Sequence, residues 1–178
     1  KPYLLPRTII SRCQQLRFRP LRRETIARFL EEQAGLEAAA ARALAASAEG
    51  GIARALQLQQ EDYLADREGI LKRLAAEQAD GPLPRLALFR YLGKSKKEIP
   101  DKLTLLQSCF RDALVWKELR DRGMLVHGDH LDQVRGIARL TTDDLLFNLD
   151  SIAASIRALE ANANKLLTLE AMTFTLRL

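Results

Sequence analysis

Cysteine is scarce in this sequence: Cys13 and Cys109 are the only two among 178 residues. They lie far apart and match neither a zinc-binding nor a disulfide spacing, so we expect reduced thiols and a cytoplasmic protein. Long apolar runs are missing too, since none approaches the roughly 20 residues of a membrane-spanning helix. The sequence therefore predicts no contact with a membrane.

The motifs of common catalytic sites are also absent. The sequence contains no Gly-rich phosphate loop and no Ser/His/Asp or Cys/His set at a usable spacing. His127 and His130 flank Gly128-Asp129, with Asp132 nearby, but no cysteine or third histidine completes a metal site. A solvated loop with Asp129 as a helix N-cap explains these residues equally well. We expect no metal site, no cofactor in this chain and no catalysis by the chain alone.

Charge is abundant but unevenly distributed. Hydrophobic residues make up 47% and charged residues 29%, which is typical of a globular protein. The net charge is +5, yet residues 1–28 hold eight basic residues and one acid, so this segment is +7 and the remainder is −2. A basic end of this kind indicates an anionic partner, such as nucleic acid, phosphate or an acidic protein surface, or a solvated basic face.

One short segment favours a β-strand. Residues 13–18 place Leu16 and Phe18 on the same side, and Pro20 ends the strand because proline lacks the N–H that a ladder needs. The sequence beyond Pro20 favours helices only. The chain therefore predicts a mainly α fold.

Three short helices follow, at residues 21–34, 36–49 and 52–60, with glycines between them. In the first helix an apolar face is expected from Leu21, Ile26, Phe29 and Leu30. The second helix is rich in alanine, the best helix former. These segments predict a small three-helix module.

Longer helices are expected in the second half. The first covers residues 61–79. The second begins at Pro82 and Pro84 and is followed by a lysine-rich loop that contains Pro100. The others cover residues 103–123, 129–140, 141–164 and 165–178. In the 103–123 helix, three- and four-residue steps predict an inward face of Leu103, Leu106, Phe110, Leu114 and Leu119. Phe110 and Trp116 are expected in the core. Thr141 and Asp144 are spaced as a capping box. The last segment is apolar nearly all round and is expected to be buried on most sides.

The stretch LLPRTIISRCQQLRF resembles a motif of the clamp-loader branch of the AAA+ family. The match is Leu4-Leu5-Pro6, Thr8-Ile9 and Ser11-Arg12-Cys13, with Arg7 as an insertion. The resemblance implies the end of an AAA+ core with its last strand (residues 1–20), a helical lid (21–60) and a helical collar that oligomerises (61–178). It also implies that the nucleotide-binding core precedes Lys1. In this family the arginine of the motif is an arginine finger, so the resemblance makes Arg12 the finger candidate, with Ser11 and Cys13 beside it. Cys13 is expected to be a small buried residue rather than a nucleophile.

Two further features are similar to the delta-prime subunits of bacterial DNA polymerase III. ATP-hydrolysing loader subunits carry a lid arginine that touches their own nucleotide; here that position is Ala53, and Arg54 lies one residue later, about 100° around the helix. The C-terminal sequence also follows the delta-prime pattern, although the asparagines could equally be a polar break between helices. The matching residues are Leu159, Asn162, Asn164, Leu167, Leu169 and Glu170.

The resemblance implies a non-hydrolysing subunit that joins gamma/tau and delta subunits in a ring of five through its collar. ATP with Mg would be bound by the neighbouring subunit, and the assembled complex would act on the sliding clamp and primed DNA. Three alternatives stay open: the ATPase (gamma/tau) subunit of the same loader, a basic helical DNA-binding module, and a plain helical scaffold.

Overall fold

The computed structural model describes residues 6–12, 14, 19–60, 62–76, 82–95 and 98–178, and helices are the only regular elements among them. The mainly α prediction is therefore confirmed. The elements, in order, are α1 (Arg7–Ile10), α2 (Arg23–Ala34), α3 (Ala38–Ser47), α4 (Ile52–Gln60), α5 (Tyr63–Ala76), α6 (Pro82–Leu92), α7 (Ile99–Leu119), η2 (Arg122–Met124), η3 (Gly128–His130), α8 (Leu131–Ile137), α9 (Thr142–Glu160) and α10 (Lys165–Thr175).

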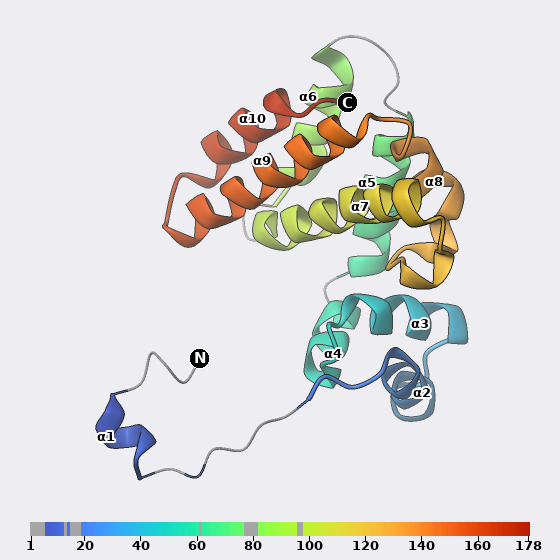
Figure 1. Ribbon diagram of the computed structural model, residues 1–178, viewed down its shortest axis with the longest axis vertical. Helices are drawn as coiled ribbons and strands as arrows, with labels where there is room; N and C mark the ends of the chain where they lie inside the picture. Colours follow the sequence, from blue (N-terminus) through green and yellow to red (C-terminus); the bar gives the residue numbers. More distant parts are fainter. Residues whose placement is uncertain (1–5, 13, 15–18, 61, 77–81, 96–97) are drawn as a thin grey trace.

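The N-terminal segment contains one helical turn that the sequence did not predict. Figure 1 draws α1 apart from the other helices. Five of the six residues of the strand predicted at 13–18, including Cys13, lie outside the described residues. Neither prediction is tested.

Helices α2, α3 and α4 form the three-helix module, with its own core around Ile26, Leu30 and Leu44. Alanines on α3 allow α2 and α3 to approach closely, which explains the alanine-rich sequence. Gly35 ends α2 as predicted: its φ is 65°, and its N–H donates to the carbonyl of Leu30. Leu21 was predicted to be inward, and this is wrong, because it precedes α2 and is 43% exposed.

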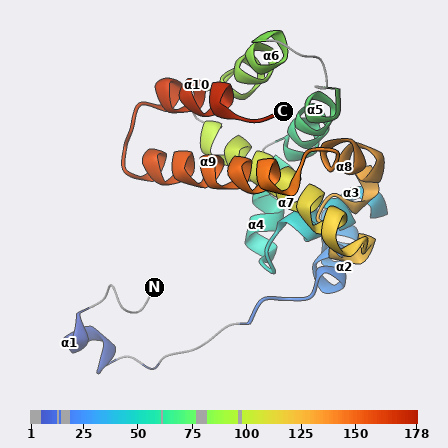
Figure 2. The same ribbon diagram turned by 45° about the horizontal axis from the view of Figure 1, so that its top comes forward.

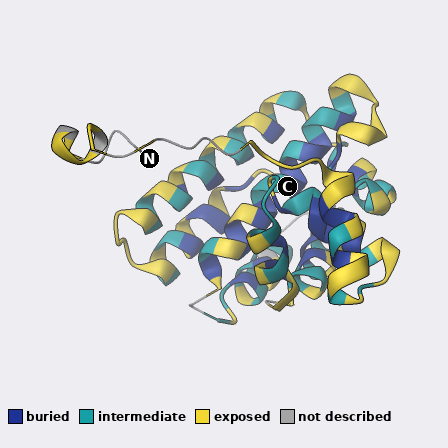
Figure 3. Cartoon of the chain, turned by 90° about the horizontal axis from the view of Figure 1, so that it is seen from below, coloured by how far each residue is buried: buried dark blue, intermediate teal, exposed yellow. Residues whose placement is uncertain are grey.

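Helices α5 to α10 form the C-terminal bundle, and α7 is its central helix. Figure 1 shows α7 with α9 on one side and α5 and α8 on the other. Phe110, Leu103 and Leu106 are fully buried, and Trp116 is nearly so, which confirms Phe110 and Trp116 as core residues. Buried residues line the inward faces of the helices in Figure 3.

Both ends of α7 differ from the prediction. The helix begins at Ile99, so Pro100 lies in its first turn rather than in a loop; proline suits this position because the N–H groups there have no intrahelical partner. Leu119 is 56% exposed, not inward. The helix ends at this residue, and the left-handed Arg120 turns the chain away before another element covers it.

Helices α9 and α10 form an antiparallel pair, and α10 also packs on α6 (Figure 2). The predicted cap of α9 is confirmed, since Thr141 Oγ1 accepts from the N–H of Asp144 at 3.1 Å. The prediction that the last helix is buried on most sides is wrong. Leu167 is 64% and Phe174 45% exposed, because α6 and α9 cover only one side of α10.

Candidate functional site

The Ser-Arg-Cys motif follows α1 directly. The turn is closed locally: Ser11 Oγ donates to the carbonyl of Thr8 at 3.2 Å, and the N–H of Arg12 donates to the carbonyl of Ile9 at 3.1 Å. Arg12 is exposed, and its side chain has no hydrogen bond or ion pair with any residue that the structure describes. The structure thus brings no second catalytic group to Arg12, whose role as a finger stays a prediction.

Arg54 points from the three-helix module to the C-terminal bundle. Its Nη2 donates to Asp101 Oδ1 of α7 at 3.3 Å, and the two side chains are 34% and 52% exposed. Ala53, at the position expected for a nucleotide-reading arginine, is exposed on α4. The guanidinium of Arg54 on α4 therefore binds a carboxylate of the bundle.

A cleft of about 580 Å³ separates the module from the bundle. Lys102 lines this cleft and is only 4% exposed. Its ammonium group pairs with Asp66 at 3.3 Å and with Glu98 at 3.1 Å. Tyr63 donates to Ser47 Oγ at 2.7 Å across the same junction, and burial raises the pKa of Tyr63 to about 12. Tyr63 thus links the two parts of the chain, whereas the pairs of Lys102 lie within the bundle.

The His-Gly-Asp-His segment is buried at its first residue, His127, and exposed at Asp129. His127 is fully buried: its Nδ1 accepts from Arg67 Nε at 3.0 Å, and its Nε2 lies 2.7 Å from Ser108 Oγ. Burial, followed by the charge of Arg67, lowers the pKa of His127 to about 3. The ring is therefore neutral and serves as a bridge between α5 and α7.

The sequence prediction of Asp129 as an N-cap is wrong. Helix α8 begins after His130 without a side-chain cap. Asp129 instead pairs with Arg67, which is only 2% exposed. The cap is displaced because the short helix η3 occupies residues 128–130. The described residues hold no group of three or more His, Cys, Asp or Glu side chains placed to share a metal ion.

Asp112 completes this network from α7. One of its oxygens accepts from the N–H of His127 at 2.7 Å and the other from Arg111 at 2.8 Å, while burial raises its pKa. Sequence reasoning missed this group. One signal was available: Lys102 and Asp112 fall on an inward stripe of α7 with Leu105, Cys109 and Trp116.

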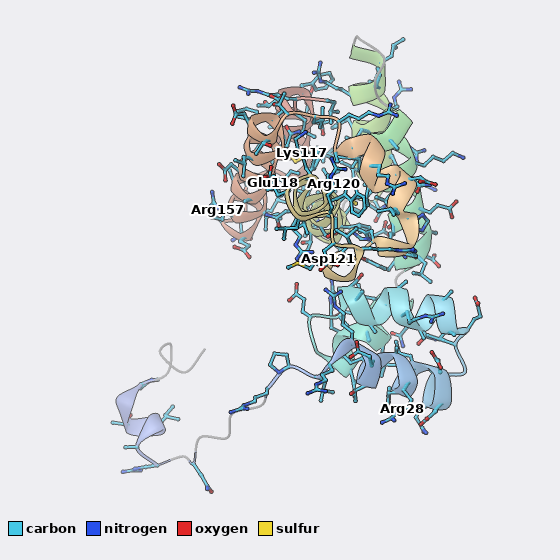
Figure 4. All side chains as sticks on the ribbon, turned by 45° about the vertical axis from the view of Figure 1, so that its right-hand side comes forward. Arg28, Lys117, Glu118, Arg120, Asp121 and Arg157 are labelled. Atoms are coloured by element: carbon cyan, nitrogen blue, oxygen red, sulfur yellow. The ribbon has the colours of Figure 1, made fainter. Side chains whose placement is uncertain are left out.

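Charged side chains also gather at the C-terminal end of α7, where Figure 4 labels four of them. Lys117 donates to the carbonyl of Ala138 at 3.2 Å, and Glu118 accepts from Thr142 at 3.0 Å. Arg120 lies 5.6 Å above the ring of Trp116, and Asp121 caps η2 by accepting from Gly123. Each charge has a structural partner, and the geometry does not form an acid–base pair.

The comparison with protein families identifies the class. Residues 61–176, which are 116 of the 178 residues, match the family described as DNA polymerase III, delta subunit, C terminal. The chain belongs to this family of clamp-loader subunit domains. No curated protein matches the chain. Among the described residues, no helix combines the length and the apolar character needed to cross a bilayer.

Proposed function

We propose that this chain is the C-terminal part of a delta-prime subunit of a bacterial clamp loader, a subunit that does not hydrolyse ATP itself. Family membership supports the clamp-loader role. Two residues favour a subunit that does not hydrolyse ATP: Ala53 stands where the nucleotide-reading arginine is expected, and Arg54 pairs with Asp101 of the subunit's own bundle. An ATP-hydrolysing subunit needs an arginine directed at its nucleotide.

In this proposal the C-terminal bundle is the collar that packs beside gamma/tau and delta subunits in a ring of five. Arg12 extends towards the ATP and Mg bound by the adjacent subunit. Its planar, permanently charged guanidinium stabilises the negative charge that grows on the transferred phosphoryl group. The exposure of Arg12 supports this role, since a residue that acts on a neighbouring chain must be accessible.

The assembled ring would then open the sliding clamp and place it on primed DNA. The chain's part is structural apart from Arg12, because the sequence contains no phosphate loop. We accordingly assign it to the cytoplasmic DNA polymerase III holoenzyme, where enzymatic turnover belongs to the neighbouring subunits.

Reconstitution tests this function and its alternatives together. The full-length subunit is mixed with gamma/tau and delta subunits, and size-exclusion chromatography is expected to show one stoichiometric complex. The purified chain alone is expected to show no ATP turnover. Turnover by the chain would favour the ATPase subunit instead. Tight, strongly salt-dependent binding of DNA by the isolated chain would favour a basic DNA-binding module.

A further inference from the structure

A groove of about 440 Å³ runs along α6 beside Tyr91, whose hydroxyl donates to Asp66. Its lining divides into two chemical types. The apolar side chains all come from α6 and are Leu83, Leu86 and Ala87. The cations are Arg73 of α5, Arg90 of α6 and Lys94 in the turn after α6. None of the lining residues within the described part of the chain is acidic.

The two chemical types occupy different ends of the groove. The α6 residues recur at three- and four-residue steps, so they form one stripe along the helix. Leu83, at the N-terminal end, is 76% exposed, while Arg90 and Lys94 lie at the C-terminal end. Residues 83 and 94 lie 11 positions apart, which corresponds to about 16 Å at the helical rise, with α6 itself ending at Leu92. This is the length of about five residues of extended peptide.

One cation of the groove is held in place before any ligand binds. The guanidinium of Arg73 lies 3.9 Å from the centre of the Tyr91 ring, and its Nη1 donates to the carbonyl of Gly69 at 2.9 Å. Tyr91 is itself fixed, because its hydroxyl donates to Asp66 at 3.0 Å. A carboxylate that binds Arg73 would therefore meet a guanidinium that has already lost much of its freedom.

The remaining cations have no carboxylate of their own in the part of the chain that the structure describes. Arg90 makes no ion pair there, and Lys94 makes none either. Glu98 is close enough to feel the charge of Lys94, but it bonds to Lys102 at 3.1 Å. The helix dipole accounts for basic residues at the end of α6 but not for the exposed Leu83 on the same stripe.

We propose that this groove binds a short acidic segment of a partner protein. About five extended residues would lie along α6, with carboxylates at Arg73, Arg90 and Lys94 and an apolar side chain over Leu83. Nucleic acid fits less well, because the apolar end offers no donor to a phosphate and Arg73 already covers the Tyr91 ring. The inference goes beyond the ring assembly and does not depend on Arg12.

Fluorescence anisotropy of the full chain tests the proposal. The probes are labelled peptides with the sequence Leu-Phe-Asp-Glu-Asp-Asp and the reverse order, and a matched peptide with lysine for every acid. We expect at least one acidic peptide to bind. The pair Arg90→Glu and Lys94→Glu is expected to weaken it by at least about tenfold. Leu83→Ser is expected to weaken it by several fold, because the apolar contact is lost.

The control is Arg157→Glu, which makes the same charge reversal as each single groove substitution but at an exposed site on α9 (Figure 4), and it is expected to leave binding unchanged. Circular dichroism checks that every variant is folded. Equal binding of the lysine peptide, or no effect of the double charge reversal, would overturn the proposal. The proposal would also be overturned if a 20-nucleotide single strand bound to the groove while the acidic peptides did not bind. The same holds if the chain associated with itself and Leu83→Ser abolished that association.

Discussion

His127 shows how an environment decides the chemistry of one residue. Its ring is fully buried and is bonded at both nitrogens, to Arg67 and to Ser108. Since Arg67 can only donate, Nδ1 must be the acceptor, and Nε2 carries the proton that Ser108 receives. Protonating Nδ1 would place a second cation against Arg67 away from water. The histidine is thus a fixed, neutral link and not a switch near physiological pH.

This assignment predicts a pH dependence of stability. The folded pKa of His127 is about 3, below the ordinary value of 6.5, so between these values the unfolded chain binds a proton that the folded chain does not. Stability is therefore complete above pH 6.5 and is lost as the pH falls, by at most about 1.4 kcal/mol per pH unit from this group. Urea unfolding across this range measures the slope.

A His127→Gln variant is the control for that slope. The raised pKa of Asp112 acts in the opposite direction, and the variant retains it, so the comparison isolates His127. We expect the variant to have a shallower pH dependence, whatever its absolute stability. An NMR signal of His127 that titrates near pH 6 in the folded protein would contradict the assignment.

At the scale of elements, the corner between α9 and α10 explains two asparagines of the C-terminal sequence. Asn162 has a φ of 63°, a left-handed conformation that asparagine tolerates better than most residues. Asn164 is the N-cap of α10, and its Oδ1 accepts from the N–H groups of Leu166 and Leu167 at 3.1 and 3.2 Å. Both residues have a local structural role, which is compatible with their match to the delta-prime pattern.

Removing the cap of α10 should therefore cost stability. Asn164→Ala leaves two N–H groups without their partner and is expected to lower the free energy of unfolding by about 1 kcal/mol. Asn164→Asp retains the acceptor and adds a favourable charge at the helix N-terminus, so it is the matched control. Thermal or urea unfolding measures both variants. Equal stability of Asn164→Ala and the parent chain would argue against the cap.

The features that the sequence predicted correctly depend on neighbouring residues in the chain. Gly35 ends α2 because of its own backbone freedom, and Thr141 caps α9 through a residue three positions later. Leu21 and Leu119 were misplaced because the helices begin and end at other residues than expected. Asp129 was misplaced because η3 occupies residues 128–130 and because its carboxylate pairs with Arg67 of α5. An apolar stripe indicates that a face can be buried, but only the packing decides which element covers it.

The buried polar network illustrates the same limit. Lys102 and Asp112 lie on an apolar stripe of α7, so their burial could have been inferred from spacing. Their partners could not. Asp66 and Arg67 belong to α5, and His127 follows a loop after α7, so only tertiary packing brings these groups together.

At the scale of the whole molecule, α5 joins the two parts of the chain. Its first residues, Tyr63 and Leu64, pack against the core of the three-helix module, while Ile70 and Leu71 belong to the core of the bundle. The pair between Arg54 and Asp101 adds a partly exposed link worth about 0.2–1 kcal/mol. Arg23 adds a hydrogen bond to the carbonyl of Leu125 at 3.1 Å. The junction is thus one shared helix with a few polar contacts around a cleft.

This arrangement is suited to a subunit that contributes to a site in another chain. The bundle supplies the large core, and α1, which directly precedes Ser11 and Arg12 in the sequence, is drawn apart from both the bundle and the three-helix module (Figure 1). A finger role requires that Arg12 affect turnover only when a neighbouring subunit holds ATP. The effect of Arg12 on a complete clamp loader is therefore the quantity that distinguishes a delta-prime role from a structural one.

The most direct measurement is ATP turnover and clamp loading by a reconstituted loader that carries Arg12→Ala in the full-length subunit. Arg19→Ala, another exposed arginine of the same basic segment, is the matched control. The account predicts that Arg12→Ala leaves ring assembly intact but slows hydrolysis at the adjacent site by about 10³-fold or more. Clamp loading should fall with it, and Arg19→Ala should change neither. Unchanged turnover and clamp loading with Arg12→Ala would contradict the account.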